Sequence, residues 1–146
     1  MKITLRDEVR EYENGTTVEE IAKSISEGLA RNAVCGKVDG KLVDLCAKID
    51  HDAKVEIITM KDEEGKEVLR HTTSHILAQA VRAIYPLAKM AIGPATSDGF
   101  YYDFEFKTPI TADDLPKIEN EMKKIIKANF EIKRSELSKK DAVKLM

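Results

Sequence analysis

A short polar stretch divides this chain into two segments with different hydrophobic patterns. Residues 61–66 are charged or glycine and show no periodicity, which is typical of a linker or an exposed loop. The segment before them alternates in strand fashion around one helical pattern, and a longer helical pattern begins after them. The sequence of 146 residues therefore predicts two small modules, residues 1–61 and residues 62–146.

The first module has the pattern of an α+β fold. Its expected strands cover residues 3–5, 9–12, 34–38, 41–45 and 55–58. Thr17 and Glu20 form a possible capping box at the start of a helix whose apolar face runs over residues 18–29. Asp39-Gly40 is a strong hairpin signal between two of the strands. One helix covering one sheet is the expected arrangement.

The second module mixes helices with short strand-like runs, and is also expected to be α+β. Helices are expected over residues 68–84, 115–130 and from 138 onward, and strands within 90–106 and 131–137. Capping signals compete before the second of these helices, because Thr111 and Asp114 fit a capping box while Pro116 prefers the first turn, so Asp113 is the expected N-cap. The last helix reaches Met146 without a stop signal, which suggests a truncated chain.

Composition and charge restrict the class of protein. Hydrophobic residues make up 42% of the chain and charged residues 34%. No apolar run approaches the roughly 18 residues of a membrane span, and no secretion signal opens the chain, so the cytoplasm is the expected location, with no membrane partner. Cys35 and Cys46 are expected to be reduced thiols without a metal. Residues 1–66 carry a balance of −4 and residues 115–146 a balance of +4, so a phosphate-facing surface is expected in the last quarter.

Two histidines give the most informative local pattern. His71 and His75 lie four residues apart in a helical segment, so their imidazoles should be neighbours on one face. Helical spacing predicts one core stripe of Leu69, Thr73, Ile76, Leu77, Ala80 and Ile84, and an opposite side with His71, His75, Ala78 and Arg82. Neutral imidazoles can ligate a metal, move a proton or bond a nucleotide sugar. Solvated surface histidines are the plain alternative.

Several reaction classes lack local support. Thr72 stands where a metalloprotease would carry its general-base glutamate, and Ser74 should project about 100° from His75, so it is interpreted as structural. The histidine pair supplies at most half of a tetrahedral metal site. Residues 92–104 contain a cluster of four aromatic residues after Gly93-Pro94. They form either a loop that approaches a ligand or an ordinary turn followed by a packed strand.

These motifs together resemble the threonyl-tRNA synthetase family. Residues 1–60 resemble the TGS domain, a ubiquitin-like β-grasp fold that certain GTPases and stringent-response enzymes share. Three segments in this order resemble the first part of that synthetase's editing domain: RHTTSHILAQAV at 70–81, IGP at 92–94 and GFYYD at 99–103. The family's downstream Cys-x-x-x-His motif is absent, so the editing site is expected to be incomplete and the fragment inactive alone.

The resemblance implies a role and partners. His71 and His75 would line a pocket where water attacks the ester of seryl-tRNA, while Tyr102 and the backbone of Gly93 would hold the terminal adenosine. No cofactor is expected on the fragment itself. The full-length enzyme would use ATP, Mg and Zn, bind tRNA and form a homodimer through a catalytic domain that this sequence does not contain.

Two other functions stay open. The chain would act as a TGS-type module that binds RNA or a nucleotide, although the acidic balance of residues 1–66 argues against this. Alternatively, it would be the amino-terminal half of a uridine-kinase-like protein with the same domains.

Overall fold

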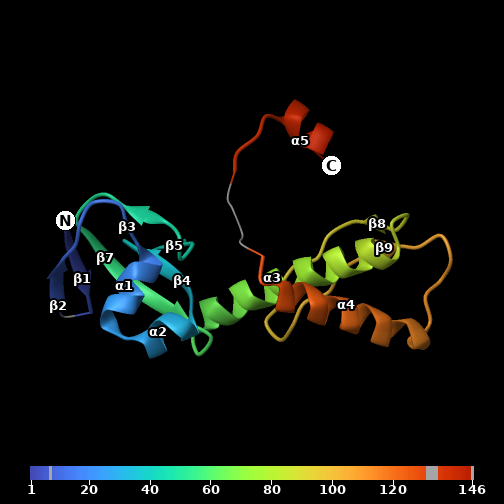
Figure 1. Ribbon diagram of the computed structural model, residues 1–146, viewed down its shortest axis with the longest axis horizontal. Helices are drawn as coiled ribbons and strands as arrows, with labels where there is room; N and C mark the ends of the chain where they lie inside the picture. The colour runs from blue at the N-terminus through green and yellow to red at the C-terminus, as the bar shows by residue number, and fades with distance from the viewer. Residues whose placement is uncertain (7, 131–134, 146) are drawn as a thin grey trace.

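The chain folds into two α+β parts that share one long helix. The computed structural model describes residues 1–6, 8–130 and 135–145. A five-stranded sheet lies at one end, and α3 runs from it into the second part (Figure 1). The strands of this sheet are β1 (Lys2–Leu5), β2 (Glu8–Glu11), β4 (Ala33–Val38), β5 (Lys41–Val43) and β7 (Ala53–Thr59), in the order β2-β1-β7-β4-β5. The predicted α+β class is confirmed.

The sheet contains both parallel and antiparallel pairs of strands. This mixed pairing is expected when two strands are followed by a helix and then by two more strands. The central strand β7 pairs in parallel with β1, and the other neighbouring strands are antiparallel. Asp39 and Gly40 both adopt positive φ, 48° and 81°, as the predicted two-residue hairpin turn between β4 and β5 requires. A separate pair, β3 (Thr16–Thr17) with β6 (Lys48–Ile49), closes the connection into α1.

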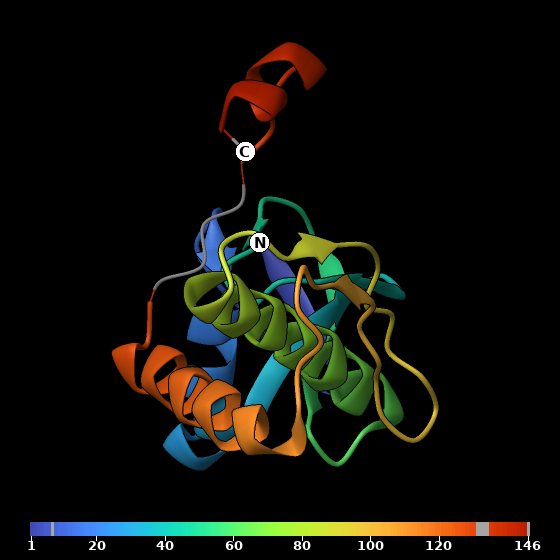
Figure 2. The same ribbon diagram turned by 90° about the vertical axis from the view of Figure 1, so that its right-hand side faces the viewer.

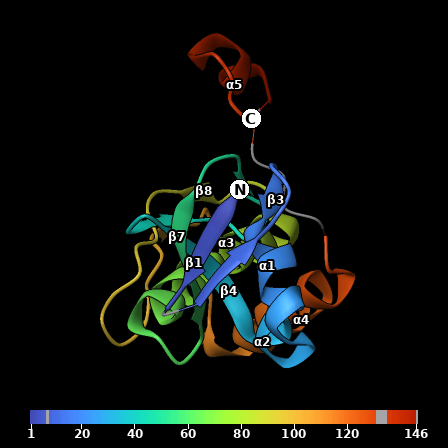
Figure 3. The same cartoon turned by 90° about the vertical axis from the view of Figure 1, so that its left-hand side faces the viewer.

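The first helix is shorter than the sequence predicts. The capping box of Thr17 and Glu20 is present and starts α1 (Val18–Ile25). Ser26 then leaves the helical region and caps α2 (Glu27–Asn32) by accepting a hydrogen bond from Leu29 N. Serine competes for backbone groups in this way and favours helix starts. The predicted continuous helix over 18–29 is therefore two helices, which lie on one side of the sheet (Figure 3).

The core of the first part lies between α1 and the sheet. Its buried residues are Ile3, Val18, Ile21, Ile49, Ala53 and Val55. Burying a side chain of this size contributes about 1.5–3 kcal/mol, and the capping box fixes which helix face meets the strands. Cys35 is buried and Cys46 exposed, and both are free thiols.

The predicted linker is mostly helix. α3 spans Glu63–Ile84, so the polar stretch supplies the first turn of this helix rather than a loop. Glu63 and Glu64 favour that end because carboxylates stabilise the positive end of the helix dipole. The turn before α3 is closed by Asp62, whose carboxylate accepts hydrogen bonds from Thr59 N at 2.7 Å and Thr59 Oγ1 at 2.9 Å.

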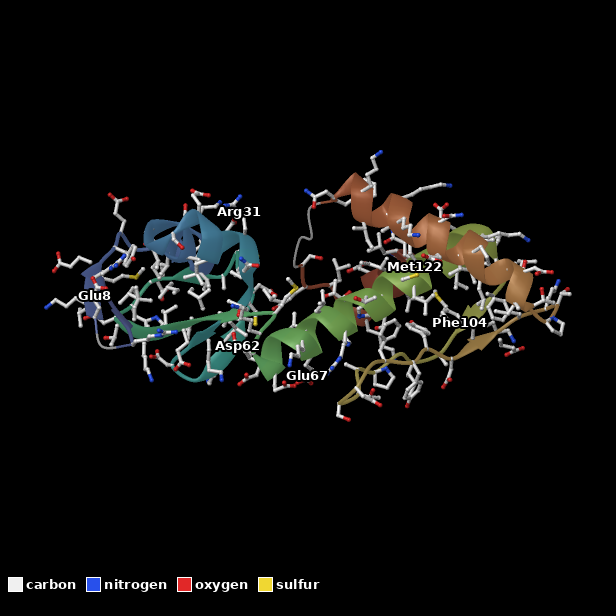
Figure 4. The ribbon with its side chains drawn as sticks, turned by 90° about the horizontal axis from the view of Figure 1, so that it is seen from below. Glu8, Arg31, Asp62, Glu67, Phe104 and Met122 are labelled. Atoms are coloured by element: carbon white, nitrogen blue, oxygen red, sulfur yellow. The ribbon has the colours of Figure 1, made fainter. Side chains whose placement is uncertain are left out.

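The second part packs a helix pair against short strands. Its elements are β8 (Lys89–Met90), β9 (Phe104–Glu105), the 3-10 turn Ala112–Asp114 and α4 (Leu115–Ala128). α3 and α4 lie side by side (Figure 2), and Ala80, Val81 and Ile118 form the buried centre between them. Phe104 and Met122 pack against this centre (Figure 4).

The N-cap in the second part differs from the prediction. Thr111, not Asp113, caps the entry: its backbone and hydroxyl bond the Asp114 carboxylate, a complete capping box ahead of Pro116. The predicted strand over 131–137 falls largely on residues 131–134, outside the described part of the chain. The last predicted helix is present as α5 (Lys139–Leu145). Among the described residues, no helix is both long and apolar enough to cross a membrane.

Candidate functional site

The two histidines meet on the exposed side of α3. His71 Nε2 and His75 Nε2 lie 3.1 Å apart, and the rings stand edge to face with centroids 4.6 Å apart. Both side chains are exposed. A hydrogen bond between two ring nitrogens needs one proton shared by the two atoms, so one imidazole donates while the other accepts. The predicted pairing on one helix face is confirmed, and the pair can hold and pass on a proton.

The rest of the helix is buried somewhat differently from the predicted stripe. Leu69 is 45% exposed, although helical spacing placed it in the core. Ala78 is 7% exposed, although spacing placed it beside the histidines. The reason is tertiary: α4 and the segment around residues 91–104 cover α3 from two directions, so its buried face is wider near residue 78 and absent near residue 69.

Ser74 connects the histidine turn to the neighbouring loop. Its side chain is fully buried, and its Oγ lies 2.7 Å from His71 O and 2.9 Å from Gly93 O. A serine hydroxyl has one hydrogen, which these two carbonyl oxygens share or alternate in accepting. The structural interpretation of Ser74 agrees with this geometry, but sequence patterns gave no sign that its partner would be Gly93.

The loop residues of the predicted site contact each other. A Cβ at Gly93 would overlap the Tyr102 ring, so the ring lies directly on the glycine backbone. Tyr102 also stacks on Phe104 with centroids 4.7 Å apart. Backbone bonds Ala91 N to Asp103 O and Asp103 N to Ile92 O, both 3.0 Å, hold the two sides of the loop together. Gly93 thus needs to be glycine for a packing reason.

The predicted histidine pair, His71 and His75, lies close to the predicted loop pair, Gly93 and Tyr102, but the two pairs are not hydrogen-bonded to each other. In the described part of the chain, we find no hydrogen bond from either imidazole to Gly93 or Tyr102. Ser74 is the only side chain there that bonds both the His71 backbone and the Gly93 backbone. Arg70 adds a second link on the same helix by donating from Nη1 to Thr96 O at 3.3 Å. Sequence reasoning did not find these two linking residues.

A metal site cannot be completed from the described residues. Nowhere within 1–6, 8–130 and 135–145 do three histidine, cysteine, aspartate or glutamate side chains gather in a way that could hold an ion. The histidine pair offers two nitrogens, and zinc takes four ligands, of which at least three come from protein. The pair by itself does not fit zinc.

Comparison with known proteins identifies the first part. Residues 1–59 match the TGS domain family, which agrees with the β-grasp arrangement of the five-stranded sheet around α1.

Comparison over the whole chain is more specific. The chain is 57% identical over 144 residues to a threonine–tRNA ligase from Desulforamulus reducens, which covers 98% of this chain and 23% of that relative. It is 55% identical over 147 residues to the threonine–tRNA ligase of Caldanaerobacter subterraneus subsp. tengcongensis, at 100% and 23% coverage. This chain matches an amino-terminal fragment of threonine–tRNA ligase. The predicted resemblance is confirmed, and the chain spans 23% of the length of these relatives.

Proposed function

We propose that this chain is the amino-terminal region of a threonine–tRNA ligase, with a TGS module over residues 1–61 and the first part of an editing domain over 62–146. Support comes from 57% identity to such a ligase along nearly the whole chain. The complete enzyme would attach threonine to its tRNA with ATP in the cytoplasm. Residues outside this chain would bind ATP, Mg and Zn and form the homodimer, and tRNA would be the main partner.

The editing role addresses a selectivity problem. Serine lacks one methyl of threonine, a difference worth only about 1–3 kcal/mol in binding. A hydrolytic pocket that removes serine from the wrongly charged tRNA raises the overall selectivity beyond this limit.

The histidine pair supplies the acid–base chemistry in this proposal. A water molecule adds to the carbonyl carbon of the seryl ester while one imidazole nitrogen accepts its proton. The bond from that carbon to the ribose oxygen then breaks, and the oxygen takes up a proton from the imidazole, which leaves serine and uncharged tRNA. The Nε2 to Nε2 distance of 3.1 Å carries this assignment, because the neighbouring ring can receive or return the proton.

Gly93 and Tyr102 would hold the terminal adenosine. The half-buried backbone of Gly93 and the half-buried Tyr102 ring beside it would offer a hydrogen bond and a stacking surface, the usual means of holding an unpaired base. The pocket needs further residues from beyond this chain, so the fragment alone is proposed to be inactive.

Deacylation of seryl-tRNA by the full-length enzyme tests the histidine assignment. His71→Ala and His75→Ala should each lower the rate by about 10²-fold or more, as expected for removal of a general acid–base group. Threonine attachment should stay unchanged. His51→Ala is the matched control, because His51 lies in the first module, bonded to Asp50 and Asp39. Wild-type deacylation in both test variants would refute the assignment.

A further inference from the structure

A cavity of about 530 Å³ opens in the first part beside β7, away from the histidines. It is lined by Leu5, Arg6, Ile25, Leu29, Lys54–Ile58 and Asp62. Its size falls within the range of ligand-binding pockets. The proposed editing function does not use any of these residues.

The cavity lies on an open strand edge. β1 pairs with β7 only through Ile3 with Ala53 and Thr4 with Lys54, whereas β7 continues to Thr59. Five consecutive residues of β7, Lys54–Ile58, line the cavity. Successive side chains of a strand point to opposite faces, so a cavity bordered by all five must border the backbone edge. In the described part of the chain, no strand pairs with that edge beyond Lys54.

The opposite edge of β7 is fully occupied. β4 pairs with it from Val55 to Thr59. The open segment is therefore an internal gap in the sheet, left because β1 ends at Leu5 and the chain turns at Arg6 with φ 53°. A gap of this kind presents backbone donors and acceptors to an added strand.

Apolar side chains from the two helices line the cavity, and these helices lie on one side of the sheet (Figure 3). Ile25, at the end of α1, is 39% exposed, and Leu29 on α2 is half-buried. The break between the two helices at Ser26 leaves these side chains beside the cavity rather than in the core. They offer a surface for alternate apolar side chains of an added strand.

The charged side chains that line the gap balance one another: Arg6 and Lys54 are positive, Glu56 and Asp62 are negative, and Lys54 pairs with Glu56 at 3.2 Å. Arg6 is exposed and makes no ion pair or hydrogen bond with any described residue. Asp62 keeps its negative charge, and its carboxylate accepts hydrogen bonds from Thr59 N and Oγ1. Hydrogen bonds from Thr59 first, and the nearby Arg6 charge to a lesser degree, hold the pKa of Asp62 below its ordinary value. Arg6 is the group left to bind an incoming carboxylate.

We propose that this gap binds an extended peptide segment of a partner protein, which adds as a strand to the free edge of β7. Its alternate apolar side chains contact Ile25 and Leu29, and an acidic side chain pairs with Arg6. Strand addition gives affinity through the main chain and selectivity through alternate side chains.

An NMR titration of the 15N-labelled chain tests the proposal with a synthetic peptide, acetyl-Val-Thr-Ile-Thr-Glu. We expect saturable shifts of the backbone amides of residues 55–58 and slower hydrogen exchange there. Arg6→Glu, or a peptide with lysine in place of glutamate, should weaken binding by about threefold or more, the range of an exposed ion pair.

Leu29→Glu should abolish the shifts, and Leu42→Glu is the matched control, since Leu42 is exposed on β5 at the sheet's far side. Should Leu29→Glu fail to fold, the exposed Arg6→Glu variant keeps the test open. Absence of shifts at 55–58, or shifts along β2 or β5 instead, would overturn the proposal. Decanoate is the second probe: if it alone shifts these amides, the cavity takes an amphipathic anion and the peptide proposal fails.

Discussion

The Tyr102 ring lies directly against the Gly93 backbone in the proposed editing site. The ring occupies the space where any other residue would carry its Cβ. The glycine therefore decides where Tyr102 lies, and Ser74 holds the same glycine to the histidine turn.

Gly93→Ala should displace the Tyr102 ring and lower the free energy of unfolding by about 1–3 kcal/mol, as overpacking does. Urea denaturation of the chain measures the change. Gly99→Ala, in the same loop, is the control, because a Cβ there meets nothing within 4 Å and should change stability by less than about 0.5 kcal/mol. Equal effects of the two substitutions would show that the Tyr102 contact is not the cause.

His51 makes stability depend on pH through two carboxylates. Its Nδ1 lies 2.9 Å from Asp50 and its Nε2 3.3 Å from Asp39. The Asp50 carboxylate first, and that of Asp39 second, raise the pKa of His51 above its ordinary 6.5. A histidine whose pKa is higher in the folded chain than in the unfolded chain stabilises the fold. This stabilisation is complete at pH values below the pKa of the unfolded chain, and it is lost as pH rises through the pKa of the folded chain.

His51→Gln should therefore destabilise the chain at about pH 5.5 and have less effect at about pH 8.5. Thermal unfolding of the wild type and the variant, each measured at both pH values, gives the comparison. A variant whose deficit is the same at both pH values would contradict this role.

Among the elements, helix α3 connects the two parts of the molecule. It begins against the first sheet (Figure 1), and its sequence carries both histidines. Gly65 is buried in its first turn, where a Cβ would overlap Thr59 O. Glu64 pairs with Lys37 on β4 at 2.7 Å, although such a partly exposed pair is worth at most about 1 kcal/mol. Close backbone packing, more than charge, fixes how the helix leaves the sheet.

Gly65→Ala should loosen this junction and cost about 1–3 kcal/mol, with faster hydrogen exchange at Thr59–Lys66. Gly28→Ala is the matched control in α2, where the nearest atom to a Cβ is 4.0 Å away. Alanine in an open helical position should instead stabilise by about 0.4–1 kcal/mol. A stabilising Gly65→Ala would mean that α3 does not need this close approach.

The molecule as a whole has two separate cores. One is built around Ile3, Val18 and Val55, and the other around Ala80, Val81 and Ile118. The main contacts between the described parts join α3 with β4 and β7. Units with separate cores commonly unfold in separate steps.

Val18→Ala and Val81→Ala, both fully buried positions, should each destabilise one step by about 2 kcal/mol and leave the other unchanged. Hydrogen exchange followed residue by residue assigns each step to its core. A single transition that both substitutions lower equally would show that α3 couples the two parts.

Much of the fold could be predicted because its signals are local. The capping box at Thr17, the hairpin turn at Asp39 and the helical spacing of His71 and His75 each depend on a few neighbouring residues. Errors arose where two local signals competed or where a distant segment decided. Ser26 could continue a helix or cap a new one, and Leu69 matched the apolar spacing but is 45% exposed in the fold.

The sequence by itself determined the α+β class, the hairpin, most helices and the pairing of the two imidazoles, because these follow from backbone propensity and helical periodicity. Only the tertiary structure decided that Ser74 bonds Gly93, that Tyr102 lies on that glycine, and that β1 ends too early to cover β7. These features depend on the distance between residues far apart in sequence, which packing sets and local patterns do not encode.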